Sequence, residues 1–302
     1  MLGHITDPSA PGGLARRELP DPEPSGDEVV VDVRAYAVNR GELSLLERRP
    51  DGWQPGQDVA GVLADGSGTR VVALAEGGGW SERVAVAASR VAPLPAGVSF
   101  AAAAALPVAG LTALRTLRVG GSLLGRRALV TGATGGVGGF AVQLAVAGGA
   151  HVTAHVSGPH RTEAAEALGP QRVVTAALGE DDGPFDVVVD GVGGPLLADA
   201  IRHLAPGGSA VAYGVSGGEP TSLHFYDFAG GPLGRLVGFF IYATEEREPF
   251  GPDLATLAGM VADGRLQVPR PVERHWADTN AAVDALRRHE ATGKVVLTVD
   301  GG

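Results

Sequence analysis

The chain has 302 residues, the length of about two ordinary domains. Hydrophobic residues make up 44% of it and charged residues 19%, so we expect a folded globular protein rather than a disordered chain. The formal net charge of −10 argues against a nucleic-acid-binding surface, because phosphate contacts need clustered lysine and arginine, and the lack of cysteine excludes disulfides and thiolate-bound zinc.

The first hundred residues are expected to form a compact, barrel-like β domain. Extended segments, each bounded by glycine, proline or aspartate, occupy residues 29–38, 59–63, 70–75 and 81–86. Short strands at this spacing are typical of a closed β domain.

An alanine-rich block follows, and Ser99 is expected to cap a helix that runs through it. Residues 100–114 are the most apolar stretch, but they are too short and too weakly apolar to span a bilayer. The N-terminus shows no basic segment followed by an apolar core, the mark of a signal peptide. We therefore expect a cytoplasmic protein that binds neither a membrane nor nucleic acid.

From residue 127 onward, strand and helix patterns alternate, which predicts a parallel sheet covered on both faces. The expected strands are 128–131, 151–156, 185–190, 209–214 and 235–241, and the expected helices are 136–147, 159–168 and 195–203. The tail adds helices at 253–263 and 279–290 and extended segments at 268–272 and 294–299. Since the alternating fold is complete before it, we expect the tail to return to the first domain.

The strongest motif is Val-Thr-Gly-Ala-Thr-Gly-Gly-Val-Gly at residues 130–138, between an expected strand and an expected helix. This is the context that a dinucleotide-binding fingerprint requires. Gly132 permits the tight turn, Gly135 lets the backbone approach a pyrophosphate, and Gly138 lets helix and strand pack closely. The amides of Gly136 and Val137, at the start of the helix, are then expected to bind the phosphates.

The residues at the end of the second expected strand of this sheet decide between NADPH and NADH, and here they favour NADPH. NAD-selective sites place an aspartate or glutamate about 20 residues after the glycines, on the ribose hydroxyls. Residues 151–161 contain no acid. Ser157 can instead donate to a 2′-phosphate, and Arg161 or His160 can offset its charge.

The same glycines also fit the short-chain dehydrogenase motif, but two observations exclude that family. About 130 residues precede the motif, whereas that family begins with it. That family also needs a tyrosine followed four residues later by lysine. The only lysine, Lys294, follows no tyrosine at that spacing.

Further segments, together with the glycine loop, carry a family resemblance over nearly the whole chain. They are Ala-Val-Asn-Arg at 37–40, Pro-Gly-Gln-Asp-Val-Ala-Gly at 55–61, the run at 104–113, Asp-Val-Val-Val-Asp-Gly-Val-Gly-Gly at 186–194 and Gly-Lys-Val-Val-Leu at 293–297. The chain resembles the zinc-free quinone oxidoreductase (zeta-crystallin-like) branch of the medium-chain dehydrogenase/reductase superfamily.

The resemblance implies a Rossmann doubly wound parallel sheet inserted in a GroES-like β-barrel domain. The GroES-like domain is expected at 1–105 and 245–302, and the NADP-binding Rossmann domain at 106–244. The family also implies a homodimer, often formed by edge-to-edge pairing of Rossmann sheets, for which residues 235–241 are the candidate edge.

Metal catalysis is not expected. Zinc-dependent relatives have Gly-His-Glu where this chain has Gly-Gln-Asp at 56–58, their upstream cysteine is absent, and the histidines are scattered. The remaining chemistry is hydride transfer from NADPH to a quinone or an α,β-unsaturated carbonyl.

Four residues are expected at the reacting end of the site. The amide of Asn39 is the candidate for polarising the acceptor carbonyl. By the resemblance, Thr112 lies near the nicotinamide. Val192 and Gly214, at the carboxyl ends of later strands, are expected around the ring, since ligands of open α/β sheets bind at those ends.

The substrate pocket is less well defined by the sequence. Tyr36, Phe239 and Phe240 are its candidate lining residues. Many relatives place a tyrosine five residues beyond the asparagine, where this chain has Ser44. The sequence therefore names no proton donor.

Two other functions remain open. One is an enoyl or polyketide-type reductase of a secondary metabolite. The other, from a different class, is a non-catalytic NADPH-binding redox sensor.

Overall fold

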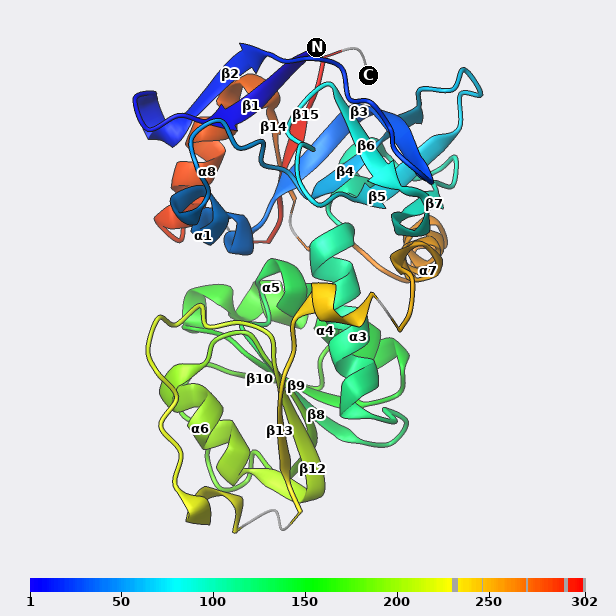
Figure 1. Ribbon diagram of the computed structural model, residues 1–302. Coiled ribbons are helices and arrows are strands. Elements are labelled where there is room, and N and C mark those ends of the chain that lie inside the picture. The colour runs from blue at the N-terminus through cyan, green and yellow to red at the C-terminus, as the bar shows by residue number, and fades with distance from the viewer. Residues whose placement is uncertain (230–232, 246, 270, 291–292, 301–302) are drawn as a thin grey trace. The chain divides into compact units, whose positions relative to one another are not determined.

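The computed structural model describes residues 1–229, 233–245, 247–269, 271–290 and 293–300. The chain divides into two compact units (Figure 1). Unit 1 comprises Met1–Leu111 and Glu245–Gly302, and unit 2 comprises Thr112–Thr244. The first boundary between the units therefore falls after residue 111, a few residues beyond the expected boundary between residues 105 and 106.

Unit 1 is built on an antiparallel sheet with strand order β14-β15-β3-β4-β5-β7, in which β6 also pairs with β3 and only β14 and β15 run parallel. A separate antiparallel pair, β1-β2, completes its strands. The bounds are β1 Leu2–Thr6, β2 Leu14–Glu18, β3 Glu28–Val38, β4 Asp58–Leu63, β5 Arg70–Leu74, β6 Arg83–Ala87, β7 Val91–Pro93, β14 Val272–His275 and β15 Val295–Thr298.

The tail of the chain joins this sheet directly. Strand β15 pairs with β3 in an antiparallel register that sets Val295 opposite Val38. The residue before β15, Lys294, consequently lies beside the residue after β3, Asn39. Alternate residues of these strands face the core of unit 1, which also holds Trp80 and Trp276.

Helices of unit 1 are α1 Arg40–Arg48, α2 Phe100–Ala104, α7 Phe250–Ala262 and α8 Thr279–Arg287. Ser99 caps α2 as expected, since its Oγ accepts a hydrogen bond from the Ala102 amide at 3.1 Å. Helix α2 runs through the alanine block as expected, but it is short. A proline lacks the amide that continues a helix, so α2 ends at Ala104 and a second helix, α3, starts at Pro107 and runs to Gly120.

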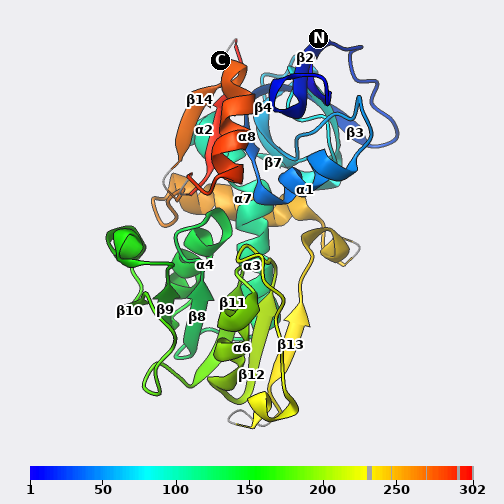
Figure 2. The same ribbon diagram turned by 90° about the vertical axis from the view of Figure 1, so that its left-hand side faces the viewer.

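Unit 2 contains a parallel sheet with strand order β10-β9-β8-β11-β12-β13. This is the order of the dinucleotide-binding fold, in which the first strand of the unit lies centrally. Its elements are β8 Arg127–Thr131, α4 Gly136–Ala147, β9 His151–His155, α5 Thr162–Glu166, β10 Arg172–Val174, β11 Phe185–Asp190, α6 Gly194–Arg202, β12 Leu204–Ala212 and β13 Arg235–Gly238. Strand β13 forms one edge of this sheet (Figure 2).

Some expected elements differ from those observed. Strands β12 and β13 end at Ala212 and Gly238, earlier than expected. Strand β14 begins at Val272, where the expected segment ended; Pro269 and Pro271 have no amide to donate to a sheet, and Arg270 lies outside the described residues. Short 3-10 turns lie at Pro11–Gly13, Ala88–Arg90, Pro159–Arg161, Phe225–Phe228, Ile241–Thr244 and Trp276–Asp278.

Candidate active site

The glycine motif forms the turn between β8 and α4. Gly132 has φ +60°, a left-handed conformation that favours glycine, and its carbonyl accepts a hydrogen bond from the Gly135 amide at 2.9 Å. Helix α4 then begins at Gly136. Residues Gly132 and 135–137 are partly exposed, so a ligand can reach their backbone.

Two features of this turn suit it to binding an anion. A Cβ on Gly138 would lie 2.2 Å from the Gly132 carbonyl oxygen, so only glycine fits between the turn and the helix. Within the described residues, no hydrogen-bond acceptor faces the amides of Gly136, Val137 or Gly138. Unpaired amides at a helix N-terminus, together with the helix dipole, attract phosphate groups. The residues therefore fit the pyrophosphate of a dinucleotide.

A buried carboxylate joins the glycine turn to the end of β11. Asp190 accepts hydrogen bonds from the Thr131 hydroxyl at 2.6 Å and from the Gly193 amide at 2.8 Å. Burial raises the pKa of Asp190, while these hydrogen bonds oppose that rise. Sequence analysis did not assign this residue a role, although an aspartate directly after a buried apolar run was a visible signal.

The predicted ring contacts lie at the carboxyl ends of β11 and β12. A methyl group of Val192 lies 3.4 Å from where a Cβ on Gly132 would stand. A Cβ on Gly214 would lie 3.0 Å from the Gly191 carbonyl oxygen, so these two loops are closely apposed. The phenol of Tyr213 packs on Gly191, so a side chain at position 191 would clash with it. The sequence analysis did not single out Tyr213.

The residues expected to read the nucleotide lie after β9. Arg161 Nη1 donates to the hydroxyl of Thr134, a residue of the glycine turn, at 3.3 Å. Its Nε is buried and has no hydrogen-bond partner among the described residues. The guanidinium therefore lies against the turn, and Ser157 is exposed nearby in the sequence.

A second polar cluster lies in unit 1, at the junction of β3 and α1. Asn39 Nδ2 donates to Asp58 Oδ2 at 2.9 Å and to Glu42 Oε2 at 3.3 Å. Lys294 Nζ donates to Asn39 Oδ1 at 2.5 Å and to Asp58 Oδ2 at 2.9 Å. Asp58 Oδ1 in turn accepts from the amide of Val108, in the first turn of α3, at 2.7 Å.

Glu42 is the titrating member of this cluster. Both of its oxygens accept backbone hydrogen bonds, from Asn39 at 2.7 Å and from Gln57 at 3.0 Å. Burial, reinforced by the negative charge of Asp58, raises the pKa of Glu42 to about 8. Protonating Glu42 leaves the buried charges of Asp58 and Lys294 balanced.

The cluster does not fit a zinc ion. Residues 56–58 replace the Gly-His-Glu segment of zinc-dependent relatives, and an ammonium group, that of Lys294, bonds directly to Asp58 there. An ammonium donates hydrogen bonds and repels a divalent cation, so it cannot share this carboxylate with zinc. Among the described residues, no group of three or more histidine, aspartate or glutamate side chains could hold a metal ion.

Tyr36 corrects an expectation. It is fully buried in the core of unit 1, its hydroxyl pairs with that of Thr279 at 2.7 Å, and its ring stacks on Trp80. A side chain without exposed surface cannot line a substrate pocket. Both faces of β3 are covered at this point, since Ala35, Ala37 and Val38 are buried as well.

The remaining predicted residues lie in unit 2. Thr112 is buried on α3. Phe239 and Phe240 follow the end of β13, and Phe240 is 67% exposed with its ring 5.3 Å from that of Tyr242. Their role in a pocket stays a prediction. Ser44, at the position of the tyrosine in relatives, is exposed on α1.

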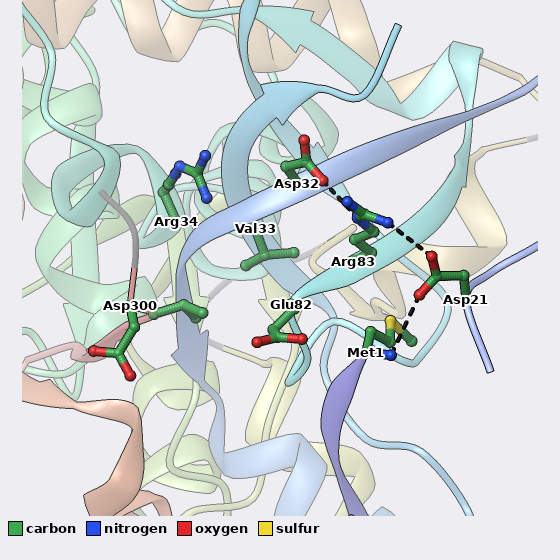
Figure 3. Close-up of a pocket in the computed structure, with 9 residues that line it drawn as sticks. Met1, Asp21, Asp32, Val33, Arg34, Glu82, Arg83 and Asp300 are labelled. Carbon is green, nitrogen blue, oxygen red and sulfur yellow. Dashed lines mark hydrogen bonds and ion pairs between the residues drawn. The ribbon is translucent and has the colours of Figure 1, made fainter. Parts of the chain in front are cut away.

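An open pocket of about 490 Å³ elsewhere in unit 1 shares no residue with these clusters (Figure 3). Its charges compensate one another. Arg83 pairs with Asp21 at 2.7 Å and with Asp32 at 2.8 Å, and the N-terminal ammonium pairs with Asp21 at 3.3 Å. This exposed ion-pair network offers no catalytic group.

Comparison with known proteins identifies the class. Residues 136–256 match the family model of zinc-binding dehydrogenases. A chloroplastic quinone-oxidoreductase homolog of Spinacia oleracea is 34% identical over 254 residues, which cover 70% of this chain and 77% of the homolog. The spectinabilin polyketide synthase system protein NorB of Streptomyces orinoci is 33% identical over 90% of this chain, but the match covers only 13% of that protein.

Solved structures agree with this class. A quinone oxidoreductase of Pseudomonas syringae superposes with a TM-score of 0.85 at 25% identity, covering 99% of this chain and 100% of the other. The fold is shared with a mycobacterial protein complexed with NADPH, at a TM-score of 0.86 and 24% identity.

The chain therefore belongs to the medium-chain dehydrogenase/reductase superfamily, with quinone oxidoreductase homologues, as the resemblance predicted. The predicted Rossmann sheet inserted in a GroES-like β domain is confirmed by the parallel sheet of unit 2 and by these neighbours. No helix within the described residues is both long and apolar enough to cross a membrane.

Proposed function

We propose that the protein is a zinc-independent, NADPH-dependent oxidoreductase that reduces a quinone or an α,β-unsaturated carbonyl. The glycine turn carries this proposal, because it combines a close approach that admits only Gly138 with three unpaired amides. When bound, the coenzyme supplies the hydride. The protein binds the phosphates, orients the nicotinamide end near Val192 and Gly214, and polarises the acceptor.

Asn39 is the proposed polarising group. One of its Nδ2 hydrogens is held by Asp58 at 2.9 Å, whereas the contact with Glu42 is longer, at 3.3 Å. The second hydrogen, which makes the longer contact, is the one that would exchange Glu42 for an acceptor oxygen. Asn39 is 8% exposed, Lys294 is 3% exposed, and Glu42 and Asp58 have no exposed surface, so Asn39 is the most exposed member of the cluster.

NADPH oxidation with a simple quinone, a simple enone and an enoyl thioester tests the proposal. Turnover of the quinone or enone, with little activity on the thioester, is the expected result. Preference for the thioester would favour the enoyl or polyketide-type reductase, a function supported by the match to NorB over most of this chain. NADPH binding without turnover of any acceptor would favour the redox sensor.

Arg161→Ala tests the coenzyme preference. We expect NADPH affinity to fall about ten- to hundredfold and NADH affinity to stay nearly unchanged, because a lost charge-assisted hydrogen bond costs about 1.5–3 kcal/mol. Fluorescence titration with both nucleotides measures this. The control is Arg126→Ala, which removes an exposed guanidinium paired with Asp186 before β8. Equal losses for both nucleotides would refute the assignment of Arg161 to the 2′-phosphate.

We also propose that the protein is a homodimer in the cytoplasm, paired through β13. Among the described residues, this edge strand pairs with β12 only, and exposed apolar side chains lie on it and just before it in the sequence. They include Leu236 at 41% exposure and Leu233 at 88%. An open sheet edge with apolar side chains is a surface that a second copy can cover.

Leu236→Lys is expected to convert the dimer to monomers at micromolar concentration, since a charge on a paired edge opposes association. Sedimentation velocity measures the mass. The control is Leu124→Lys, at an apolar residue 80% exposed before β8. A wild-type monomer, or a Leu236→Lys dimer, would contradict pairing through this edge.

A further inference from the structure

Lys294 is the only lysine of the chain, and its side chain is buried. It stands immediately before β15, and the pairing of β15 with β3 brings it to Asn39, 255 residues away in the sequence. Within the part of the chain that the structure describes, its ammonium bonds only to side chains of the cluster already described, donating to Asn39 and Asp58. A buried ion pair is weak evidence for stability, because desolvation offsets the Coulomb attraction. This placement calls for another explanation.

The ammonium determines which way the Asn39 carboxamide points. A lysine ammonium can only donate hydrogen bonds, and ionised carboxylates can only accept them. The carboxamide must therefore turn its oxygen toward Lys294 and its nitrogen toward Asp58, as observed. With a neutral residue at position 294, the carboxamide oxygen loses its donor, and only the bonds from Nδ2 to Asp58 and Glu42 still hold the carboxamide.

Asp58 extends the same constraint to α3. One of its oxygens bonds to Lys294 and Asn39, and the other accepts from the Val108 amide. Since the first amides of a helix lack intrahelical partners, Asp58 acts as the cap of α3. The ammonium thus holds one carboxylate that serves both the amide and the helix.

We propose that Lys294 is a positioning residue that fixes the orientation of the Asn39 carboxamide. It holds Oδ1, so that Nδ2 is the atom left to donate to an acceptor in place of its longer contact with Glu42. This inference rests on the proposed function of Asn39. Lys294 itself need not touch the acceptor or the coenzyme.

The chain offers a chemical test with a matched control. It contains no cysteine, so Lys294→Cys creates a single thiol. Alkylation of the unfolded chain with bromoethylamine, followed by refolding, restores an ammonium on a side chain of lysine length. Alkylation with bromopropane gives the same length with a methyl group in place of the ammonium. Wild-type protein, unfolded and refolded in parallel, is the reference.

The aminoethyl form is expected to regain the kcat of refolded wild type. The propyl form should bind NADPH as tightly as wild type, because the glycine turn lies in unit 2, yet its kcat should fall about 10²-fold, the effect of removing one oriented donor. A propyl form with the kcat of the aminoethyl form would overturn the proposal.

Amide resonances give a readout that does not depend on activity. Asn39 and Asn280 are the two asparagines of the chain, so isotope-labelled asparagine yields two side-chain amide pairs. In wild type and the aminoethyl form, the Asn39 pair should exchange slowly with solvent. In the propyl form it should exchange faster, while the Asn280 pair, bonded to the Leu14 carbonyl, stays unchanged. An unaltered Asn39 pair would count against the proposal.

Lys294→Met with Asp58→Asn covers the case in which the propyl form does not refold, because this double variant leaves neither partner as an unpaired charge. A folded double variant with low kcat and fast Asn39 exchange supports the proposal. If the double variant had the kcat of wild type, or if neither the propyl form nor the double variant folded, Lys294 and Asp58 would serve folding alone, and the proposal would be overturned. If wild type itself turns over no acceptor, the proposed function fails, and the amide resonances still decide the orientation.

Discussion

Replacing Gly138 with alanine is expected to abolish high-affinity NADPH binding. The added Cβ would stand 2.2 Å from the Gly132 carbonyl oxygen and 2.8 Å from its carbon, both rigid backbone atoms of the turn. The turn and the start of α4 must then separate, which moves the amides away from the phosphates. We expect an affinity loss of more than about a hundredfold, since overpacking costs about 1–3 kcal/mol before any loss of phosphate contacts.

Fluorescence titration measures this affinity, and circular dichroism reports whether the variant is folded. Gly259→Ala is the matched control, because Gly259 lies within helix α7 and a Cβ there meets no atom within 4 Å. That control should bind NADPH as wild type does. If Gly138→Ala also bound NADPH as wild type does while folded, the turn could not be the phosphate site.

Glu42→Gln is expected to remove a large pH dependence of stability. The pKa of Glu42 is raised from 4.5 in a model peptide to about 8 in the folded chain. Between these values the folded state holds a proton that the unfolded state has released, so stability falls as pH rises from about 4.5 to about 8. Burial is the largest cause of this raised pKa; of the charged neighbours, Asp58 raises it further and Lys294 lowers it.

Denaturant unfolding at several pH values measures the effect. Wild type should lose up to about 3–5 kcal/mol across this range relative to Glu42→Gln. The variant is expected to be less stable overall, because the NH2 group of its amide faces the backbone N–H of Gln57 or Asn39, and two donors cannot bond to each other. The comparison is therefore between the slopes of stability against pH. Glu47→Gln, on the exposed face of the same helix, should keep the wild-type slope. Equal slopes for wild type and Glu42→Gln would show that Glu42 is ionised when folded.

Local patterns in the sequence predicted the features that depend on neighbouring residues. The glycine turn between β8 and α4 is an example, since the left-handed Gly132 and the crowded Gly138 follow from spacing alone. The same is true of the Ser99 cap. These features need no knowledge of distant parts of the chain.

Contacts between distant segments could not be read in this way. In the sequence analysis Lys294 helped to exclude one family and formed part of a segment that resembles another, but it was given no role; the structure bonds it to Asn39 across 255 positions. Tyr36 was expected in a pocket because its strand partners were unknown, and the register of β3 instead buries it beside Thr279. Asp190 likewise gains its role from a neighbouring strand, through Thr131.

Isothermal calorimetry of the purified chain with NADPH and with NADH tests the central claim most directly. Saturable binding of NADPH at one site per chain, tighter than that of NADH, is the expected result. No detectable binding of either nucleotide would contradict the coenzyme site on the glycine turn, and with it the assignment of the protein as a reductase.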